Sequence, residues 1–325
     1  MDQNLDYTLL YRVAKAYYKD KMTQQEIAEV ENFSRSQISR MLKRAQDEEL
    51  VTYTLNFPSG VDEDSLSRSL KQALGLERVI LIPSFYQGKQ KASNDEICKN
   101  LALGAADHFP DLLGEAKVIG VGWGRSVYSA SLYVRPQPIL RGRVFVPLIG
   151  SSGDSNPMLQ VNTIVDRFGE RFHAERKYVN LQSLQPRDTF TPRDLETLNS
   201  LRSKWKELDA AIIGIGGPPT HMRNIISEFP KYYKKQIQSS GTVGDILSQF
   251  FYEDGRVFEQ DEHFRLLALN LKDLPKIPNV IALAAGREKC LPICVAAKLG
   301  YIKTLVTDYD TATSILEYKK GEENV

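Results

Sequence analysis

The sequence predicts an α/β protein, with a small all-helical domain followed by a doubly wound, mostly parallel α/β domain. Three observations support this prediction. The first fifty residues carry apolar positions at helical spacing, and beyond them short β-branched runs alternate with helical patterns. The length of 325 residues also suits about two domains. We expect the domains to span 1–57, including a short linker strand over 51–55, and 58–325, since Pro58-Ser59-Gly60 ends that strand.

Composition excludes several classes of protein. Hydrophobic residues make up 42% and charged residues 26%, which is ordinary for a globular chain, and no apolar run approaches the roughly 18 residues of a membrane span. The N-terminus lacks the basic and apolar regions of a secretory signal. We therefore expect a cytoplasmic protein with no membrane partner. The net charge of +1 gives no global electrostatic argument for any ligand.

Three helices are expected in the first domain. The first spans Leu5 to Tyr18, the second runs from the capping box of Thr23 and Glu26 to about Val30, and the third begins at the N-cap candidate Ser34 and reaches Gln46. The inward stripe of the third helix consists of Ile38, Met41, Leu42 and Ala45.

Two short helices joined by a tight turn, with one helix before them, are the layout of a helix-turn-helix DNA reader. Arg35, Ser36, Gln37 and Arg40 would meet base edges, because arginine pairs with guanine and glutamine with adenine. Lys43, Arg44 and the cap of the preceding helix would contact phosphates. The alternative is a charged face on an unrelated helical domain, although no acid lies between Ser34 and Gln46. The DNA-binding candidates are Thr23, Gln24, Ser34, Arg35, Ser36, Gln37, Arg40, Lys43 and Arg44.

In the second domain, short apolar runs alternate with helical patterns, which predicts a largely parallel sheet covered by helices. The expected strands are 79–82, 118–121, 144–148, 210–213, 280–284 and 304–306, and the expected helices are 97–108, 126–133, 195–205 and 289–298. Ligands of such sheets bind at the carboxyl ends of the strands.

Glycine loops follow several of these strands. The run from Ile119 to Ser126 passes from a strand through Gly122, Trp123 and Gly124 into a helix, whose free N–H groups suit a phosphate or sugar oxygen. Arg125 would pair with an anion. The run is neither a dinucleotide fingerprint nor a Walker A loop, and a tight turn without a ligand would use the same residues.

Similar glycine-bearing loops occur at 147–154, 214–217 and 285–289. Loops that meet at one edge of a sheet would form a pocket. Lys289, at a helix start, is either a phosphate partner or a solvated surface lysine. The cysteines Cys98, Cys290 and Cys294 do not form a disulfide framework, and we expect them to be small core residues rather than metal ligands.

These motifs resemble the SorC family of bacterial sugar-responsive transcriptional regulators. In the first domain the similar segments are Ala14–Tyr18, Thr23–Ala28 and Ser34–Ala45, and in the second they include GVGWGRSVY, VPLIGSSGD, QVNTIVDRF, GTVGDILSQFFYEDGRV and IALAAGREKCLPICVAA. Glu49-Leu50 stands where the family commonly has a glycine. The resemblance implies a fold related to sugar-phosphate isomerases and deaminases. It also implies an effector pocket formed by Gly122, Trp123, Gly124, Arg125, Ser126, Gly150, Gln160, Asp245 and Lys289.

Two departures from the family pattern concern the effector. Ala285 replaces a glycine that many members have, and no lysine lies between Pro147 and Asn156, which excludes a Schiff-base adduct from that loop. Effector binding should therefore be non-covalent, with Gln160 and Asp245 suited to sugar hydroxyls and Arg125 and Lys289 to a phosphate.

Two functions follow from these expectations. The first is a transcriptional regulator of a carbohydrate operon that binds operator DNA under the control of a sugar or sugar phosphate, without a cofactor. The second is a sugar-phosphate isomerase or deaminase with an added helical domain, for which Asp154, Asp245 or His221 would be candidate acid/base residues. Since single reader helices usually pair on half-sites, we expect at least a dimer, and the resemblance suggests a tetramer.

Overall fold

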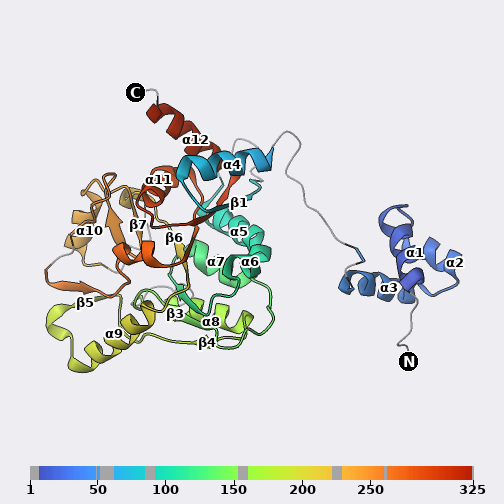
Figure 1. The fold of residues 1–325 in the computed structure, drawn as a ribbon, viewed down its shortest axis with the longest axis horizontal. Helices are drawn as coiled ribbons and strands as arrows, with labels where there is room; N and C mark the ends of the chain where they lie inside the picture. The colour runs from blue at the N-terminus through green and yellow to red at the C-terminus, as the bar shows by residue number, and fades with distance from the viewer. Residues whose placement is uncertain are drawn as a thin grey trace. The chain divides into compact units, whose positions relative to one another are not determined.

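The computed structural model describes residues 7–48, 50–51, 62–84, 92–152, 160–221, 229–259 and 262–323. Its contacts divide the chain into two compact units, Met1–Ser59 and Gly60–Val325 (Figure 1). Most of the linker strand expected over 51–55 lies outside the described residues.

The small unit consists of three helices, α1 (Tyr7–Tyr18), α2 (Gln24–Glu31) and α3 (Arg35–Asp47). Thr23 and Glu26 form the expected capping box at the start of α2, and Asn32 ends that helix with a φ of 56°. The three helices share one apolar core, which contains Leu10, Val13, Ile27, Ala28, Ile38, Met41 and Leu42. The stripe predicted for the third helix therefore faces inward.

The large unit is built on a seven-stranded sheet in the order β1-β11-β10-β6-β2-β3-β4, with every neighbouring pair parallel. The strands are β1 (Arg78–Ile82), β2 (Val118–Val121), β3 (Val144–Pro147), β4 (Glu175–Arg176), β6 (Ala210–Gly214), β10 (Asn279–Leu283) and β11 (Thr304–Asp308). Two antiparallel pairs lie outside this sheet, β5 (Leu184–Pro186) with β9 (Phe264–Leu266) and β7 (Gly244–Ile246) with β8 (Gln249–Phe251).

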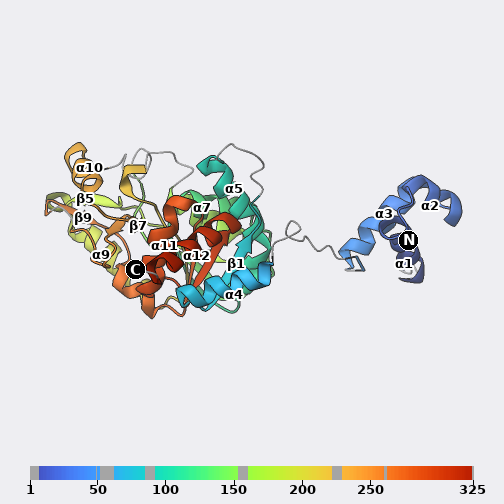
Figure 2. The same ribbon diagram turned by 90° about the horizontal axis from the view of Figure 1, so that it is seen from above.

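Helices cover both faces of the sheet. On one face α5 (Asn94–Ala105), α7 (Arg125–Tyr133) and α8 (Val161–Arg171) pack against one another. On the other, α4 (Glu63–Leu74), α11 (Cys290–Lys298) and α12 (Tyr309–Glu323) form a second group, and β1 lies between α4 and α5 in Figure 2. The unit also contains α6 (Phe109–Leu113), α9 (Pro192–Trp205) and α10 (Lys231–Gln238).

The expected parallel sheet is confirmed, because all six predicted strands are present and belong to it. The strand pattern was readable since each strand is almost completely buried and its sequence is therefore continuously apolar. The interior includes the aromatic cluster of Phe109, Phe145, Phe168 and Phe172. All three cysteines are buried thiols. Among the described residues, no helix is long and apolar enough to cross a membrane.

Candidate functional site

The glycine loops of the large unit lie at one edge of the sheet. Because β2, β3, β6 and β10 are parallel, the segments that follow them, 122–124, 148–152, 215–217 and 284–289, all leave from the carboxyl ends of their strands. The β7–β8 hairpin joins them, since the backbone N–H of Gly216 donates to the carbonyl of Asp245 at 2.9 Å. This convergence, which we call the carboxyl edge, is the candidate ligand site.

The loop after β2 leads directly into α7. Gly124 caps this helix with a φ of 118°, a conformation that disfavours any residue with a side chain, and no side chain caps the first turn. Arg125 lies 3.4 Å from Asp95 of α5, so its charge has a partner, although the side chain of that partner is largely exposed. The hydroxyl of Ser126 is buried and lies 3.5 Å from Cys98 Sγ.

Asp245 is a deeply buried charged group of the carboxyl edge, at 3% exposure. Its Oδ2 accepts a hydrogen bond from the backbone N–H of Ser248 at 3.2 Å, whereas Oδ1 has no partner. Burial raises the pKa of Asp245 to about 7, and the positive charge of Lys289 opposes this shift. The pKa of the Asp245 carboxyl group therefore lies close to neutral pH, and its Oδ1 is available to a ligand.

Lys289 also acts on a second buried carboxyl group. Asp308, at the end of β11, is 2% exposed, and burial raises its pKa while hydrogen bonds from Thr311 and the charge of Lys289 lower it. The positive charge of Lys289 thus lowers the pKa of two buried acids, Asp245 and Asp308, which belong to separate strands. The lysine lies in the turn Arg287–Lys289 after β10, as the sequence predicted, and is partly buried.

Unpartnered polar atoms mark the same edge. Among the described residues, seven buried side-chain nitrogen or oxygen atoms lack a hydrogen-bond partner. Five of them belong to the loops or strand ends of the carboxyl edge: Trp123 Nε1, Ser152 Oγ, Asp245 Oδ1, Ser248 Oγ and Thr307 Oγ1. An unsatisfied buried polar group is costly, so a concentration of both donors and acceptors is typical of a site for a polar ligand.

Three of these five residues, Ser152, Ser248 and Thr307, were not among the sequence candidates. Ser152 and Thr307 lie at or just after the carboxyl ends of predicted strands, where ligands of parallel sheets bind. Their positions could therefore have been used to predict them as site residues. Ser248 gave none, because its place depends on the hairpin turn in which Leu247 and Ser248 adopt φ values of 52° and 58°.

Two other candidates have structural surroundings that the sequence did not reveal. A Cβ added to Gly150 would lie 2.6 Å from the backbone nitrogen of Ser183, so the glycine permits close contact between two backbones. Gln160 stands at the N-terminus of α8, the helix that follows β3. Asp154, proposed as a possible base, lies outside the described residues.

The nucleic-acid candidates gather on α3 and the start of α2. Arg35, Ser36, Gln37, Arg40 and Lys43 are all exposed, while Ile38, Met41 and Leu42 face the core. Thr23 and Ser34 are both N-caps whose hydroxyls accept from the backbone N–H of Glu26 and Gln37. The exposed face of α3 therefore presents cations and amides along its first three turns.

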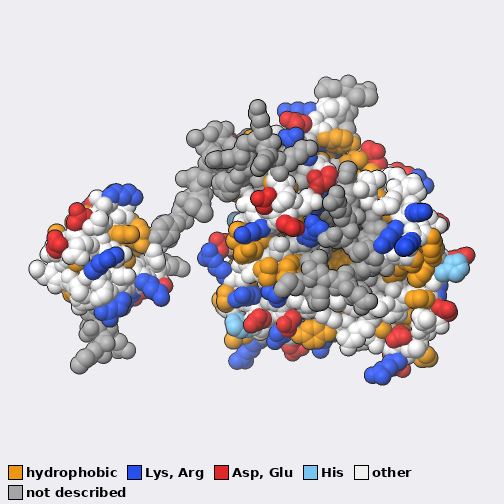
Figure 3. Space-filling model, turned by 180° about the vertical axis from the view of Figure 1, so that it is seen from behind, with side chains coloured by type: hydrophobic (Ala, Val, Ile, Leu, Met, Phe, Trp, Pro, Cys, Tyr) orange, Lys and Arg blue, Asp and Glu red, His pale blue; other side chains and the backbone are white. Residues whose placement is uncertain are grey.

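Two of these side chains already have intramolecular partners. Gln37 completes a capping box with Ser34, and Arg44 forms an ion pair with Glu48 one turn later. Both residues were predicted from the sequence to contact DNA, and neither intramolecular bond was predicted. Figure 3 shows positive and negative side chains interspersed over one face of the large unit, in keeping with the net charge of +1.

Comparison with known proteins connects this architecture to a family. A family model described as "Putative sugar-binding domain" matches residues 61–317, which is most of the chain. The chain belongs to this sugar-binding domain family. The matched residues contain the complete carboxyl edge, from the glycine loop after β2 to Asp308.

The similarity to individual relatives extends over the small unit of the chain as well. It is 27% identical over 326 residues to the sorbitol operon regulator of Klebsiella pneumoniae, covering 98% of this chain and all of the relative. The transcriptional regulator LsrR of Escherichia coli K12 is 27% identical, covering 94% of this chain and 93% of the relative. The crystal structure of the full-length Klebsiella regulator SorC superposes with a TM-score of 0.74 at 28% identity, covering 97% of this chain and 100% of that one. The expected membership of the SorC family is confirmed.

Proposed function

We propose that this protein is a DNA-binding transcriptional regulator of a sugar or polyol operon, whose operator affinity is set by a sugar or sugar phosphate bound at the carboxyl edge. The observation that carries the proposal is the end-to-end similarity to an operon regulator, which spans both the three-helix unit and the sugar-binding domain. An enzyme of the isomerase class would have no use for the exposed basic face of α3.

The proposed DNA contacts divide into two kinds. Arg35, Ser36, Gln37 and Arg40, with Ser34 at the cap, lie at the amino-terminal half of α3 and would meet base edges in the major groove. Lys43 and Arg44, together with Thr23 and Gln24 at the start of α2, would contact phosphates and set the register.

The proposed effector contacts follow from the chemistry of the carboxyl edge. Trp123 Nε1 can donate, Asp245 Oδ1 can accept, and the hydroxyls of Ser152, Ser248 and Thr307 can do either. Such a mixture suits a ligand with several hydroxyl groups. Lys289 and Arg125 would pair with a phosphate, and with no lysine between Pro147 and Asn156 the complex would be non-covalent.

A ligand can change DNA affinity only if it binds the DNA-competent and DNA-incompetent states with different affinity. We propose that these states are arrangements of a homo-oligomer, dimer or tetramer, because helix-turn-helix readers bind paired half-sites. Size-exclusion chromatography with light scattering should give at least twice the chain mass of 36.8 kDa. A monomer with and without DNA would contradict this arrangement.

A paired experiment tests the function. A thermal-shift screen of sugars, polyols and their phosphates on the full chain should yield a compound that raises the melting temperature, because a ligand of the native state stabilises it by mass action. That compound should then change the affinity for DNA from upstream of the protein's own operon, measured by fluorescence anisotropy. Absence of any stabilising compound at millimolar concentration, or of sequence-specific DNA binding, would contradict the proposal.

We also propose that no turnover accompanies effector binding. Asp245 resembles a general base in burial and titration range, but its role here would be to accept hydrogen bonds from the effector. Incubation with the stabilising compound should leave it chemically unchanged by NMR. Conversion of the compound at a rate that depends on Asp245 would favour the isomerase alternative.

A further inference from the structure

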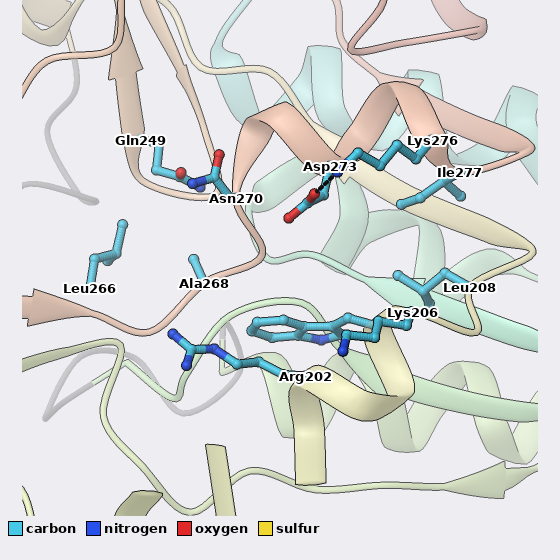
Figure 4. A pocket seen from close by; sticks show the side chains of 11 residues that line it. Arg202, Lys206, Leu208, Gln249, Leu266, Ala268, Asn270, Asp273, Lys276 and Ile277 are labelled. Carbon is cyan, nitrogen blue, oxygen red and sulfur yellow. Dashed lines mark hydrogen bonds and ion pairs between the residues drawn. The ribbon is translucent and has the colours of Figure 1, made fainter. Parts of the chain in front are cut away.

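A pocket lies beside the carboxyl edge, and none of the proposed effector contacts is among the residues that line it. It has a volume of about 600 Å³, within the range of small-molecule sites, and is formed between the last turn of α9 and the segment 266–277 (Figure 4). The pocket reaches Leu208 and Ile277, which precede β6 and β10. It therefore extends to the amino ends of two strands whose carboxyl ends lead into loops of the carboxyl edge.

The pocket has a fixed apolar wall. The indole of Trp205 lines it, and its Nε1 donates to the carbonyl of Pro147 at 2.8 Å, which holds the ring in place. Leu208, Leu266 and Ile277 add further apolar surface. Trp205 is 9% exposed, so a ligand ring would contact only the part of the indole that borders the pocket.

The polar lining is rich in free donors and poor in free acceptors. The side chains of Arg202 and Lys206 are exposed and have no hydrogen-bond or ion-pair partner in the part of the chain that the structure describes. The side-chain nitrogen of Asn270 is likewise unpartnered there. By contrast, Gln249 is bonded to backbone groups of Leu269 and Leu271. The carboxylate of Asp273 is 2.6 Å from Lys276.

Arg202 and Lys206 are separated by one helical turn and line the same pocket, as Figure 4 shows. Basic residues at the end of a helix also interact favourably with the helix dipole. Lys204, in the last turn of α9, can interact with the helix dipole in this way, and its side chain is paired with Glu207 at 2.7 Å. Two unpaired cations directed at a preformed cavity therefore indicate an anionic ligand.

We propose that this pocket is a second ligand site, for a small organic phosphate with a flat ring such as a nucleoside monophosphate. The phosphate lies against Arg202 and Lys206, where both cations are free to bind it, and the ring packs on the Trp205 wall. Asn270 donates to an acceptor on the ligand. The residues that line this pocket differ from the proposed effector contacts, and the proposal does not depend on the proposed regulatory function.

Fluorescence titration of the full chain with adenosine 5′-monophosphate tests the proposal. In a Trp123→Phe background Trp205 is the single tryptophan, because the sequence has two, so a saturable change in emission reports binding at this pocket. Adenosine alone and inorganic phosphate alone should each bind at least tenfold more weakly, since each satisfies only one part of the site.

The double variant Arg202→Ala/Lys206→Ala, made in the same background, should weaken nucleotide binding at least tenfold. Arg193→Ala is the matched control, because Arg193 is an exposed arginine of α9 that does not line the pocket. Equal melting temperatures would show that the variants remain folded. No emission change with nucleotide at several millimolar, or equal affinity in the double variant and the control, would overturn the proposal.

Discussion

The carboxamide oxygen of Gln37 accepts two hydrogen bonds from Ser34, one from its backbone N–H at 2.8 Å and one from its hydroxyl at 2.9 Å. A side chain proposed to read a base is therefore also part of the structure that begins α3. Its NH2 group remains available, and this is the group that would donate to adenine N7 in a bidentate contact.

Substitution at Gln37 should separate these two roles. Gln37→Glu keeps the acceptor of the capping box but removes the donor, so we expect altered preference at one operator base pair, by about 1–3 kcal/mol, with little loss of stability. Gln37→Ala should lose both the preference and about 1 kcal/mol of capping. Competition binding against single-base operator variants, with thermal unfolding, measures both effects. Equal losses on every operator for both variants would contradict base readout.

The phosphate contacts should appear in the salt dependence. Lys43→Ala should weaken binding to all DNA sequences alike and reduce the slope of log K against log salt concentration by about one. Arg44→Ala should act in the same direction but less strongly, because Glu48 already neutralises part of the arginine charge. Titrations between 50 and 200 mM salt, on operator and unrelated DNA, provide the test. A sequence-specific loss in either variant would reassign that residue to base contacts.

Stability should depend on pH through Asp245. Its pKa is about 7 in the folded protein and 3.8 in the unfolded chain, so the folded state binds the proton more tightly. The stabilisation from this proton is complete below pH 4 and is lost as the pH rises through 7. Asp245→Asn cannot ionise, so its melting temperature relative to the wild type should increase between pH 4 and pH 8. A difference that is constant over this range would contradict the raised pKa.

Lys289 should control the response to a phosphorylated effector. Lys289→Ala should leave operator affinity in the absence of effector unchanged and reduce the effector response at least tenfold, because it removes a cation at the carboxyl edge. Arg287→Ala is a suitable control, since Arg287 is an exposed basic residue of the same turn. Anisotropy titrations with and without effector compare the two. A full response in Lys289→Ala would remove the residue from the effector site.

Gly150 should be intolerant of any side chain. Gly150→Ala places a methyl group against the backbone of Gln182 and Ser183, and we expect a loss of about 1–3 kcal/mol in the free energy of unfolding. Gly321→Ala, in open space on α12, should leave stability unchanged or raise it slightly. Urea denaturation of both variants makes the comparison. An equal loss of stability in the two variants would show that the close approach of the two backbones does not require a glycine at position 150.

The local patterns were sufficient for much of the fold. The capping box at Thr23, the inward stripe of α3 and the six buried strands depend on neighbouring residues, so periodicity and turn chemistry revealed them. Five α-helices of the described residues were not predicted: 63–74, 109–113, 161–171, 231–238 and 309–323. The last of these, α12, is only weakly amphipathic, so its helical period leaves little trace in the sequence.

The fold class could be predicted from the sequence, because helix caps, strand hydrophobicity and glycine loops are local properties of the chain. Which polar groups lack a hydrogen-bond partner depends on the tertiary structure. Asp245 and Lys289, or Arg202 and Asn270, are brought near the same site by strand order and by crossover connections rather than by spacing. Burial and the loss of water then give these groups their chemistry, since desolvation depends on everything that packs around an atom.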